Sequence, residues 1–201
     1  YGNVYPGAQI PFGGIQISPD TDSRFYDAAS GYKYNHLTLM GFSLTHLSGT
    51  GIPDLGDFLF IPGTGEMKLE PGTHEDPDQG YRSRYSHDKE WASPNYYAVE
   101  LADYGVKAEM TSGVRSGMFR FTYPESDNAF IMIDMNHTLW QSCEWSNLRM
   151  INDSTITGYK LVKGWGPERH VYFTATFSKK LTGLRFVPVS YTHLTLPTTP
   201  Y

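Results

Sequence analysis

Cysteine is almost absent from the 201-residue chain, which contains only Cys143. A single thiol cannot form an internal disulfide, and it cannot supply the paired cysteines of a structural zinc site. Long apolar runs are equally scarce, and none approaches the roughly 20 residues that a helix needs to cross a bilayer. The sequence therefore predicts no transmembrane segment, and it leaves the redox compartment open.

Basic residues are also few, with 16 lysines and arginines against 21 acidic residues and a formal net charge of −5. No basic stripe can neutralise a phosphate backbone, so the composition argues against a nucleic-acid-binding protein. Aromatic residues make up 15% and hydrophobic residues 39% of the chain. These values are typical of a globular protein rather than a disordered or membrane protein. A mildly acidic, aromatic-rich chain is compatible with a neutral partner such as a sugar.

Both ends of the chain are unusual. It opens at Tyr1 within Gly/Pro-rich sequence, without a methionine or a signal peptide, and we expect a start and any signal to have been lost. Residues 189–201 resemble a reading-frame translation of a sequencing-library adapter; the alternative is a Thr-rich edge strand that stops at a proline. We expect the biological domain to span residues 1–188, and we exclude the tail, with His193, from functional reasoning.

Helical periodicity is scarce, and alternation of apolar and polar residues dominates. In residues 170–177 the apolar side chains fall on one face, which is typical of a half-buried strand. Residues 97–101 and 106–110 alternate around the turn residues 102–105, which predicts a hairpin. Further strands are expected at residues 14–18, 58–61, 118–123, 129–135 and 156–163.

Short strands separated by Gly, Pro and Asp predict an all-β fold, an antiparallel β-sandwich in one domain. The first 65 residues hold most of the tight Gly/Pro punctuation, and long ordered loops on a sheet scaffold are usually functional. Aromatic rings can stack on the apolar faces of sugars. We expect most of the four tryptophans to lie in the core, with Trp165 as the exception because the motif Gly164-Trp-Gly-Pro167 predicts a turn.

The densest group of chemically versatile residues lies between Gly41 and Asp57. Its glycines allow a ligand to approach the backbone, and its N–H groups can face an anion or a sugar hydroxyl. His46 could orient a hydroxyl, and Asp54 with Asp57 could accept from a sugar or bind a cation. The structural alternative is that the acidic residues and glycines only cap turns and that the histidine is merely hydrogen-bonded.

Convincing catalytic carboxylates are missing. Asp54 and Asp57 are close in sequence, which does not show the roughly 6.5–9.5 Å separation across a sugar that an inverting glycosidase needs. Glu75, Asp76 and Asp78 could form an oxygen-rich calcium loop, but they lack EF-hand spacing, and a solvated acidic loop is the favoured interpretation.

The order of the motifs is more specific than any one of them, and it resembles the N-terminal domain of glycoside hydrolase family 92 from Tyr1 to about Phe186. The motifs include Tyr5-Pro-Gly-Ala, Ser30-Gly-Tyr-Lys-Tyr34, His46-Leu-Ser-Gly-Thr-Gly51, Asp54-Leu-Gly-Asp57, Tyr85-Ser-His-Asp-Lys-Glu90 and Lys163-Gly-Trp165. Two departures are present: Leu44 replaces a histidine that the family usually has, and Phe25-Tyr26 stands where a tryptophan is common. These departures leave the preference for a glycosidic linkage open.

The resemblance implies a fragment of a calcium-dependent, inverting exo-α-mannosidase (α-1,2-mannosidase-like) that acts on terminal α-mannosides of N-glycans or mannan. It implies a supersandwich-like domain that packs against an (α/α)6 barrel, which this chain lacks. The acid, the base and the main calcium ligands would come from that barrel, so no catalytic residue is assigned here and the fragment alone is expected to be inactive.

The sandwich loops would then contribute to the sugar pocket. The expected substrate-binding residues are His46, Ser48, Gly49, Thr50, Asp54, Asp57 and Trp165. Family analogy also implies a periplasmic, cell-surface or secreted protein. A free-standing carbohydrate-binding β-sandwich module without catalysis is the alternative.

Overall fold

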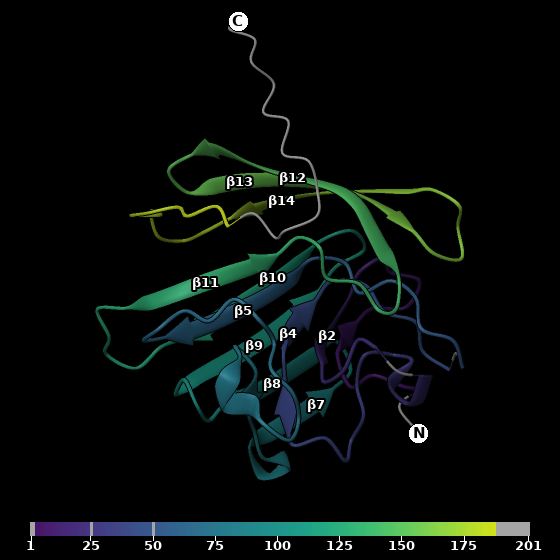
Figure 1. Ribbon diagram of the computed structural model, residues 1–201, viewed down its shortest axis with the longest axis horizontal. Coiled ribbons are helices and arrows are strands. Elements are labelled where there is room, and N and C mark those ends of the chain that lie inside the picture. The colour runs from purple at the N-terminus through teal and green to yellow at the C-terminus, as the bar shows by residue number, and fades with distance from the viewer. Residues whose placement is uncertain (1–2, 25, 50, 188–201) are drawn as a thin grey trace, which may run out of the picture. The chain divides into compact units, whose positions relative to one another are not determined.

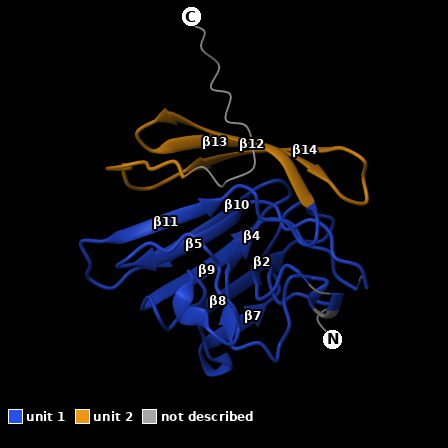
Figure 2. Cartoon of the chain, viewed as in Figure 1, with its two compact units in different colours: residues 1–141 blue, residues 142–201 orange. Residues whose placement is uncertain are grey.

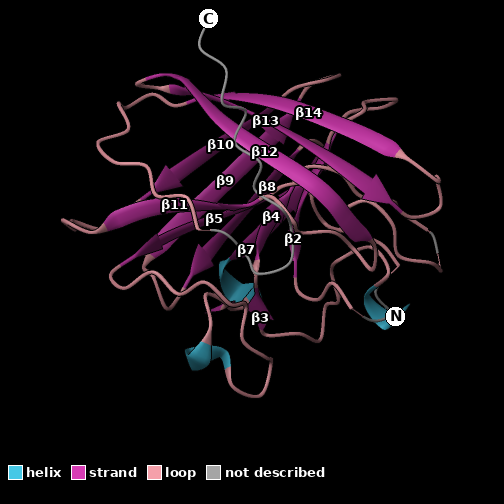
Figure 3. Ribbon diagram, turned by 45° about the horizontal axis from the view of Figure 1, so that its top comes forward, coloured by secondary structure: helices cyan, strands magenta, loops and turns pink. Residues whose placement is uncertain are grey.

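The computed structural model describes residues 3–24, 26–49 and 51–187 (Figure 1). Strands dominate these residues, and the helical content is limited to the single-turn 3-10 helices η1 (Tyr26–Ala28), η2 (Pro77–Gln79) and η3 (His87–Lys89) (Figure 3). None of the helices in the described ranges has the length and hydrophobicity that a bilayer crossing requires. All strand pairs are antiparallel, which confirms the predicted all-β class.

The chain forms two compact units, residues 1–141 and 142–201 (Figure 2). The strands of the first unit are β1 (Ala8–Gln9), β2 (Gln16–Asp20), β3 (Thr38–Leu39), β4 (Gly41–Ser43), β5 (Leu59–Thr64), β6 (Ser83–Arg84), β7 (Glu90–Ser93), β8 (Tyr96–Leu101), β9 (Val106–Ser112), β10 (Gly117–Thr122) and β11 (Ala129–Asp134). Those of the second unit are β12 (Ser142–Asn152), β13 (Thr155–Lys163) and β14 (Arg169–Thr176).

The two larger sheets of the first unit form a sandwich. One has the order β1-β2-β4-β5-β11, and the other has the order β10-β9-β8-β7; β3 and β6 form a separate two-stranded sheet. Ile17 and Phe42 from the first sheet share a core with Tyr97, Val99 and Val106 from the second. Full burial of each large apolar side chain contributes roughly 1.5–3 kcal/mol, so this shared core holds the two layers together.

The hairpin predicted from alternation is present as β8 and β9. Leu101 pairs with Val106 across a turn that ends at Gly105, whose φ is 63°. A positive φ is cheap for glycine and strained for most other residues. Strands β10 and β11 follow one another in the sequence but do not pair with each other. Strand β11 pairs with β5 instead, and Ala129 lies opposite Thr64.

The second unit is an antiparallel sheet with the order β12-β13-β14. Along β14 half-buried and exposed residues alternate strictly, as predicted for residues 170–177. Strand β12 was not expected. Its register shifts between Cys143 and Trp145, and again between Met150 and Asn152, and such bulges interrupt the alternation that reveals a strand in sequence.

The tryptophans depart from the prediction of core burial. Trp91, Trp140 and Trp145 are 46%, 53% and 36% exposed, and Trp165, the expected exception, is 69% exposed. Position explains the difference, because Trp91 lies on β7 and Trp145 on β12, both edge strands, while Trp140 lies between β11 and β12. All four tryptophans are therefore at least one-third exposed.

Candidate functional site

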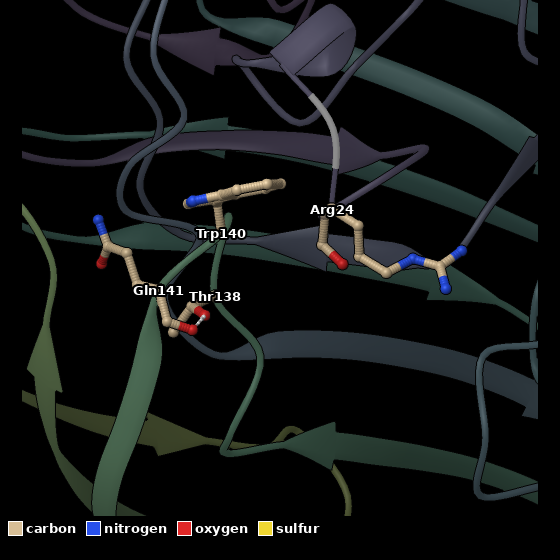
Figure 4. A pocket seen from close by; sticks show the side chains of 5 residues that line it. Arg24, Thr138, Trp140 and Gln141 are labelled. Carbon is tan, nitrogen blue, oxygen red and sulfur yellow. Dashed lines mark hydrogen bonds between the residues drawn. The ribbon is translucent and has the colours of Figure 1, made fainter.

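A pocket of about 350 Å3 opens in the first unit where the segment after β2 meets the segment after β11 (Figure 4). It is lined by Ser23, Arg24, Thr138, Trp140 and Gln141. The backbone N–H of Trp140 donates to the carbonyl of Ser23 at 2.9 Å, which joins the two segments. The hydroxyl of Thr138 donates to the carbonyl of Gln141 at 2.7 Å and fixes the turn that carries Trp140.

Trp140 is held in a strained backbone conformation. Its φ is 66°, in the left-handed region that costs a residue with a Cβ roughly 1–2 kcal/mol. Its indole is 53% exposed and packs at 5.1 Å, at an angle of 51°, against the ring of Tyr26. Backbone strain persists where the surroundings enforce it, and it clusters at ligand sites. Of the five residues that line the pocket, Trp140 is the one with a positive φ and an aromatic ring, and we take it as the centre of the site.

Residues 54–57 of the predicted sugar-binding loop pack against residues 138–139, which directly precede Trp140. The carbonyl of Leu55 accepts from the N–H of Leu139 at 2.9 Å. Gly56 has a φ of 73°, and a Cβ there would lie 2.6 Å from Cγ and 2.9 Å from N of Leu139. Only a glycine allows the loop to approach residues 138–140 so closely.

We expect Gly56→Ala to destabilise the chain through two effects: the strain of a positive φ, about 1 kcal/mol, and overpacking against Leu139, about 1–3 kcal/mol. Gly49→Ala is the matched control, because Gly49 has a φ of 78° but nothing within 4 Å of an added Cβ. Thermal denaturation of both variants separates clash from strain. Equal loss of stability in the two variants would show that the contact with Leu139 is unimportant.

A buried carboxylate connects the loop to the pocket segments. One oxygen of Asp20, the last residue of β2, lies 2.8 Å from Nε2 of His46, and the other lies 2.8 Å from Nε2 of His137. Nδ1 of His46 lies 2.7 Å from the carbonyl of Gln16. A carboxylate and a carbonyl only accept, so the ring of His46 can donate to both only when each nitrogen carries a proton.

The electrostatics agree with a charged pair. Burial by itself would raise the pKa of Asp20, but the charge of His46 and the hydrogen bonds from His137 and His46 outweigh it and hold the pKa well below its usual range. The carboxylate therefore stays ionised in the interior, with both oxygens engaged. His137 is three residues from Trp140, so this network helps to fix the pocket wall.

The predicted site residues fall into three groups. His46 and Asp57 are buried, and Asp54 is half-buried; the carboxylate of Asp54 accepts from the N–H of Leu55 at 2.6 Å, and that of Asp57 accepts from the hydroxyl of Thr45 at 2.7 Å. Ser48 and Gly49 are exposed. The remaining two residues are Thr50, which lies outside the described residues, and Trp165, which is exposed in the second unit.

The predicted loop packs behind the pocket, against residue 139. The residues that line the pocket come from the segments after β2 and after β11. His46 is only 2% exposed, and both nitrogens of its ring contact oxygen atoms of the protein. This geometry favours a structural role for His46, which holds the loop against β2. Sugar contact by the loop remains a prediction. Arg24 and Gln141 gave no signal in the sequence, because they lie in separate loops whose meeting depends on tertiary structure.

The acidic loop at residues 75–78 is solvated. Glu75, Asp76 and Asp78 are exposed, and the carboxylate of Asp78 pairs with Arg84 at 2.7 Å. Calcium takes six to eight oxygen ligands, and the described part of the chain contains no group of three or more acidic, histidine or cysteine side chains placed to hold a metal. These residues therefore do not fit a calcium site.

The residues that line the pocket offer groups that can bind a polar ligand. Arg24, Thr138 and Gln141 can supply hydrogen-bonding groups, and Trp140 supplies an aromatic face. None of the five lining residues is a carboxylic acid, whereas glycoside hydrolysis needs a pair of them.

Solved structures resemble this chain over most of its length. The gh92 family glycosyl hydrolase ccman5 is 28% identical, with a TM-score of 0.69, over 87% of this chain and 24% of that one. The family GH92 inverting mannosidase BT2199 from Bacteroides thetaiotaomicron is 24% identical, with a TM-score of 0.67, over 86% of this chain and 22% of that one. The latter likeness supports the fold.

Sequence comparison gives the same picture. An uncharacterized secreted glycosidase from Arthroderma benhamiae is 28% identical over 128 residues, or 63% of this chain and 16% of that protein. The chain thus spans a quarter or less of the length of these relatives. The family model for the glycosyl hydrolase family 92 N-terminal domain matches residues 1–195, past the expected boundary at residue 188, which stays a prediction. The chain belongs to glycosyl hydrolase family 92, and the match is to its N-terminal domain.

Proposed function

We propose that the intact protein is an inverting exo-α-mannosidase (α-1,2-mannosidase-like) that hydrolyses terminal α-mannosides of N-glycans or mannan. In this proposal the chain supplies a wall of the sugar pocket. The observation that carries this role is the strained, exposed Trp140, which is joined to Ser23 and packed on Tyr26 beside Arg24. Membership in the family and the likeness to mannosidases support the reaction.

The pocket chemistry suits a pyranose. Such a ring offers C–H groups on its face and hydroxyl groups on its rim. The indole of Trp140 can stack on the C–H face, while the guanidinium of Arg24 and the amide of Gln141 can bond the hydroxyls. Arg24 and Gln141 lie on either side of Trp140 in Figure 4, and both side chains extend away from its ring, so contact with a stacked sugar would require them to turn toward it.

Catalysis is assigned to residues beyond this chain. The general acid, the general base and the ligands of the calcium ion would belong to an (α/α)6 barrel, since the pocket residues include no carboxylate. Calcium would orient the sugar and neutralise developing charge when bound there. We also propose a periplasmic, cell-surface or secreted location, which the naming of one relative as secreted supports.

The purified 201-residue chain is expected to give no turnover of an aryl α-mannoside in the presence of calcium, because it lacks an acid/base pair at its pocket. Release of the aryl alcohol is the measurement, with a parallel reaction in a chelator. Turnover that the chelator abolishes would contradict the assignment of catalysis to another domain.

A carbohydrate-binding module without catalysis is the second candidate, and the absence of a carboxylate from the pocket lining favours it. The two candidates predict different coding sequences downstream of this chain. Sequencing an intact clone downstream of codon 188 should reveal several hundred codons of helical sequence if the enzyme is correct, and a stop or a linker if the module is.

A further inference from the structure

One face of the β12–β14 sheet carries a row of aromatic side chains that the pocket does not use. Tyr159 on β13 lies opposite Asn147 on β12 and Tyr172 on β14. In the adjoining row of the ladder, Leu161 lies opposite Trp145 and His170. Directly opposed residues of antiparallel strands project from the same face. We refer to Trp145, Tyr159, His170 and Tyr172 as the aromatic face.

The rings of the aromatic face contact one another. Tyr159 lies 5.0 Å from Trp145, 4.6 Å from Tyr172 and 5.8 Å from His170, between ring centroids. Tyr172 is 70% exposed and Trp145 is 36% exposed. The cluster thus forms a continuous aromatic surface across all three strands, and much of it remains open.

Hydrogen bonds hold this surface in place. The hydroxyl of Tyr159 lies 2.7 Å from Nδ1 of His170, and Nε2 of the same ring lies 2.7 Å from a carboxylate oxygen of Glu168. Rings fixed before binding lose less side-chain entropy when a ligand arrives. The arrangement is therefore prepared for stacking.

The surrounding residues indicate the chemistry of the partner. The next row on the same face consists of Arg149, Thr157 and Thr174, all able to bond hydroxyl groups. The charge of Lys163 is paired with Glu144 at 3.1 Å. The face alternates aromatic and hydrogen-bonding rows, and it carries the positive charge of Arg149.

The opposite face of the sheet is mostly apolar. It carries Leu148, Ile156, Val162, Val171 and Phe173, with the polar side chains of Ser146, Lys160 and Arg169 among them. What sets the aromatic face apart is its cluster of contacting rings, and a hydroxyl-rich partner can use both these rings and the hydrogen-bonding groups beside them.

We propose that the aromatic face binds an oligosaccharide chain. Pyranose rings stack on Trp145 and Tyr172, and Arg149, Asn147 and the threonines bond their hydroxyls. This site is separate from the Trp140 pocket and does not depend on its function. It would retain a polymer on the protein without cleaving it.

The test measures retardation of the 201-residue chain in gels that contain soluble yeast mannan. Tyr172→Ala and Trp145→Ala are each expected to weaken mannan affinity about tenfold, the loss expected for an aromatic stacking contact. Trp91→Ala is the matched control, because Trp91 is 46% exposed in the first unit, and it should bind mannan as the parent does.

Equal melting temperatures across the variants establish that they are folded. Two outcomes would overturn the proposal. One is a parent chain that mannan does not retard, and the other is retardation that Tyr172→Ala and Trp145→Ala leave unchanged. Sedimentation of the same samples adds a further criterion: self-association of the parent that Tyr172→Ala removes, without an effect on mannan, would identify the face as a protein contact instead.

Discussion

Replacing Asp20 with alanine should destabilise the first unit by about 3–5 kcal/mol, the cost of removing one partner from a buried ion pair. The carboxylate is fully buried and contacts both His46 and His137 at 2.8 Å. Its removal leaves Nε2 of both rings without the buried acceptor that each contacts. Urea denaturation followed by tryptophan fluorescence measures the loss, and a loss of this size is a large fraction of the stability of an ordinary domain.

A matched exposed pair provides the control. Asp78→Ala also removes a carboxylate from a cation, Arg84, but both side chains are largely exposed, and solvent screens such pairs. Its unfolding midpoint should stay close to that of the parent. Similar midpoints for Asp20→Ala and Asp78→Ala would show that the buried network contributes little.

The pH dependence follows from the lowered pKa of Asp20. A carboxyl whose pKa is lower in the folded state stabilises it fully above the unfolded pKa, here 3.8, and this stabilisation is lost as the pH falls toward the folded value. The parent should therefore lose stability below about pH 4 more steeply than Asp20→Asn, which has no proton to gain. Parallel curves for the two proteins would contradict the assignment.

In the intact protein, Trp140→Ala is expected to lower kcat/KM about thirtyfold. The loss corresponds to about 2 kcal/mol, the lower limit for truncating an aromatic residue that dominates a binding site. The melting temperature should change little, because the indole is 53% exposed. The alanine substitution also keeps the backbone hydrogen bonds of residues 139 and 140.

Trp91→Ala in the same protein controls for loss of an exposed tryptophan and should leave the kinetics unchanged. Active-site titration of each preparation separates an effect on the folded enzyme from partial unfolding. Unaltered kcat/KM in Trp140→Ala would remove the pocket from the proposed sugar site.

Local pattern was sufficient to predict part of the fold. Residues 97–101 and 106–110 alternate cleanly and flank a Gly-containing turn, so the β8–β9 hairpin follows from side-chain period and turn chemistry alone. Strand β12 was not predicted because two bulges interrupt the alternation of its apolar and polar residues. The pairing of β11 with β5 was equally hidden, since nothing in either strand specifies a partner about 70 residues away.

The site was less accessible from sequence than the strands. The motif at residues 46–57 was recognised as a dense polar group, yet its members chiefly bond to the loop itself and to Asp20. The lining residues Arg24 and Trp140 become neighbours only when Trp140 reaches Ser23. Side-chain chemistry can be read from sequence at each of these positions, but their convergence depends on the tertiary fold.

The late position of β11 has a consequence for biosynthesis. The sheet that contains β2, β4 and β5 gains its last strand from residues 129–134, and Asp20 gains its second histidine 117 residues after its own position. A nascent chain that has not yet emerged to His137 exposes the edge of β5 and holds a carboxylate with incomplete partners. Contacts of such separation slow folding, and unpaired edges invite association. The first unit should therefore remain dependent on chaperone protection until nearly all of it has left the ribosome.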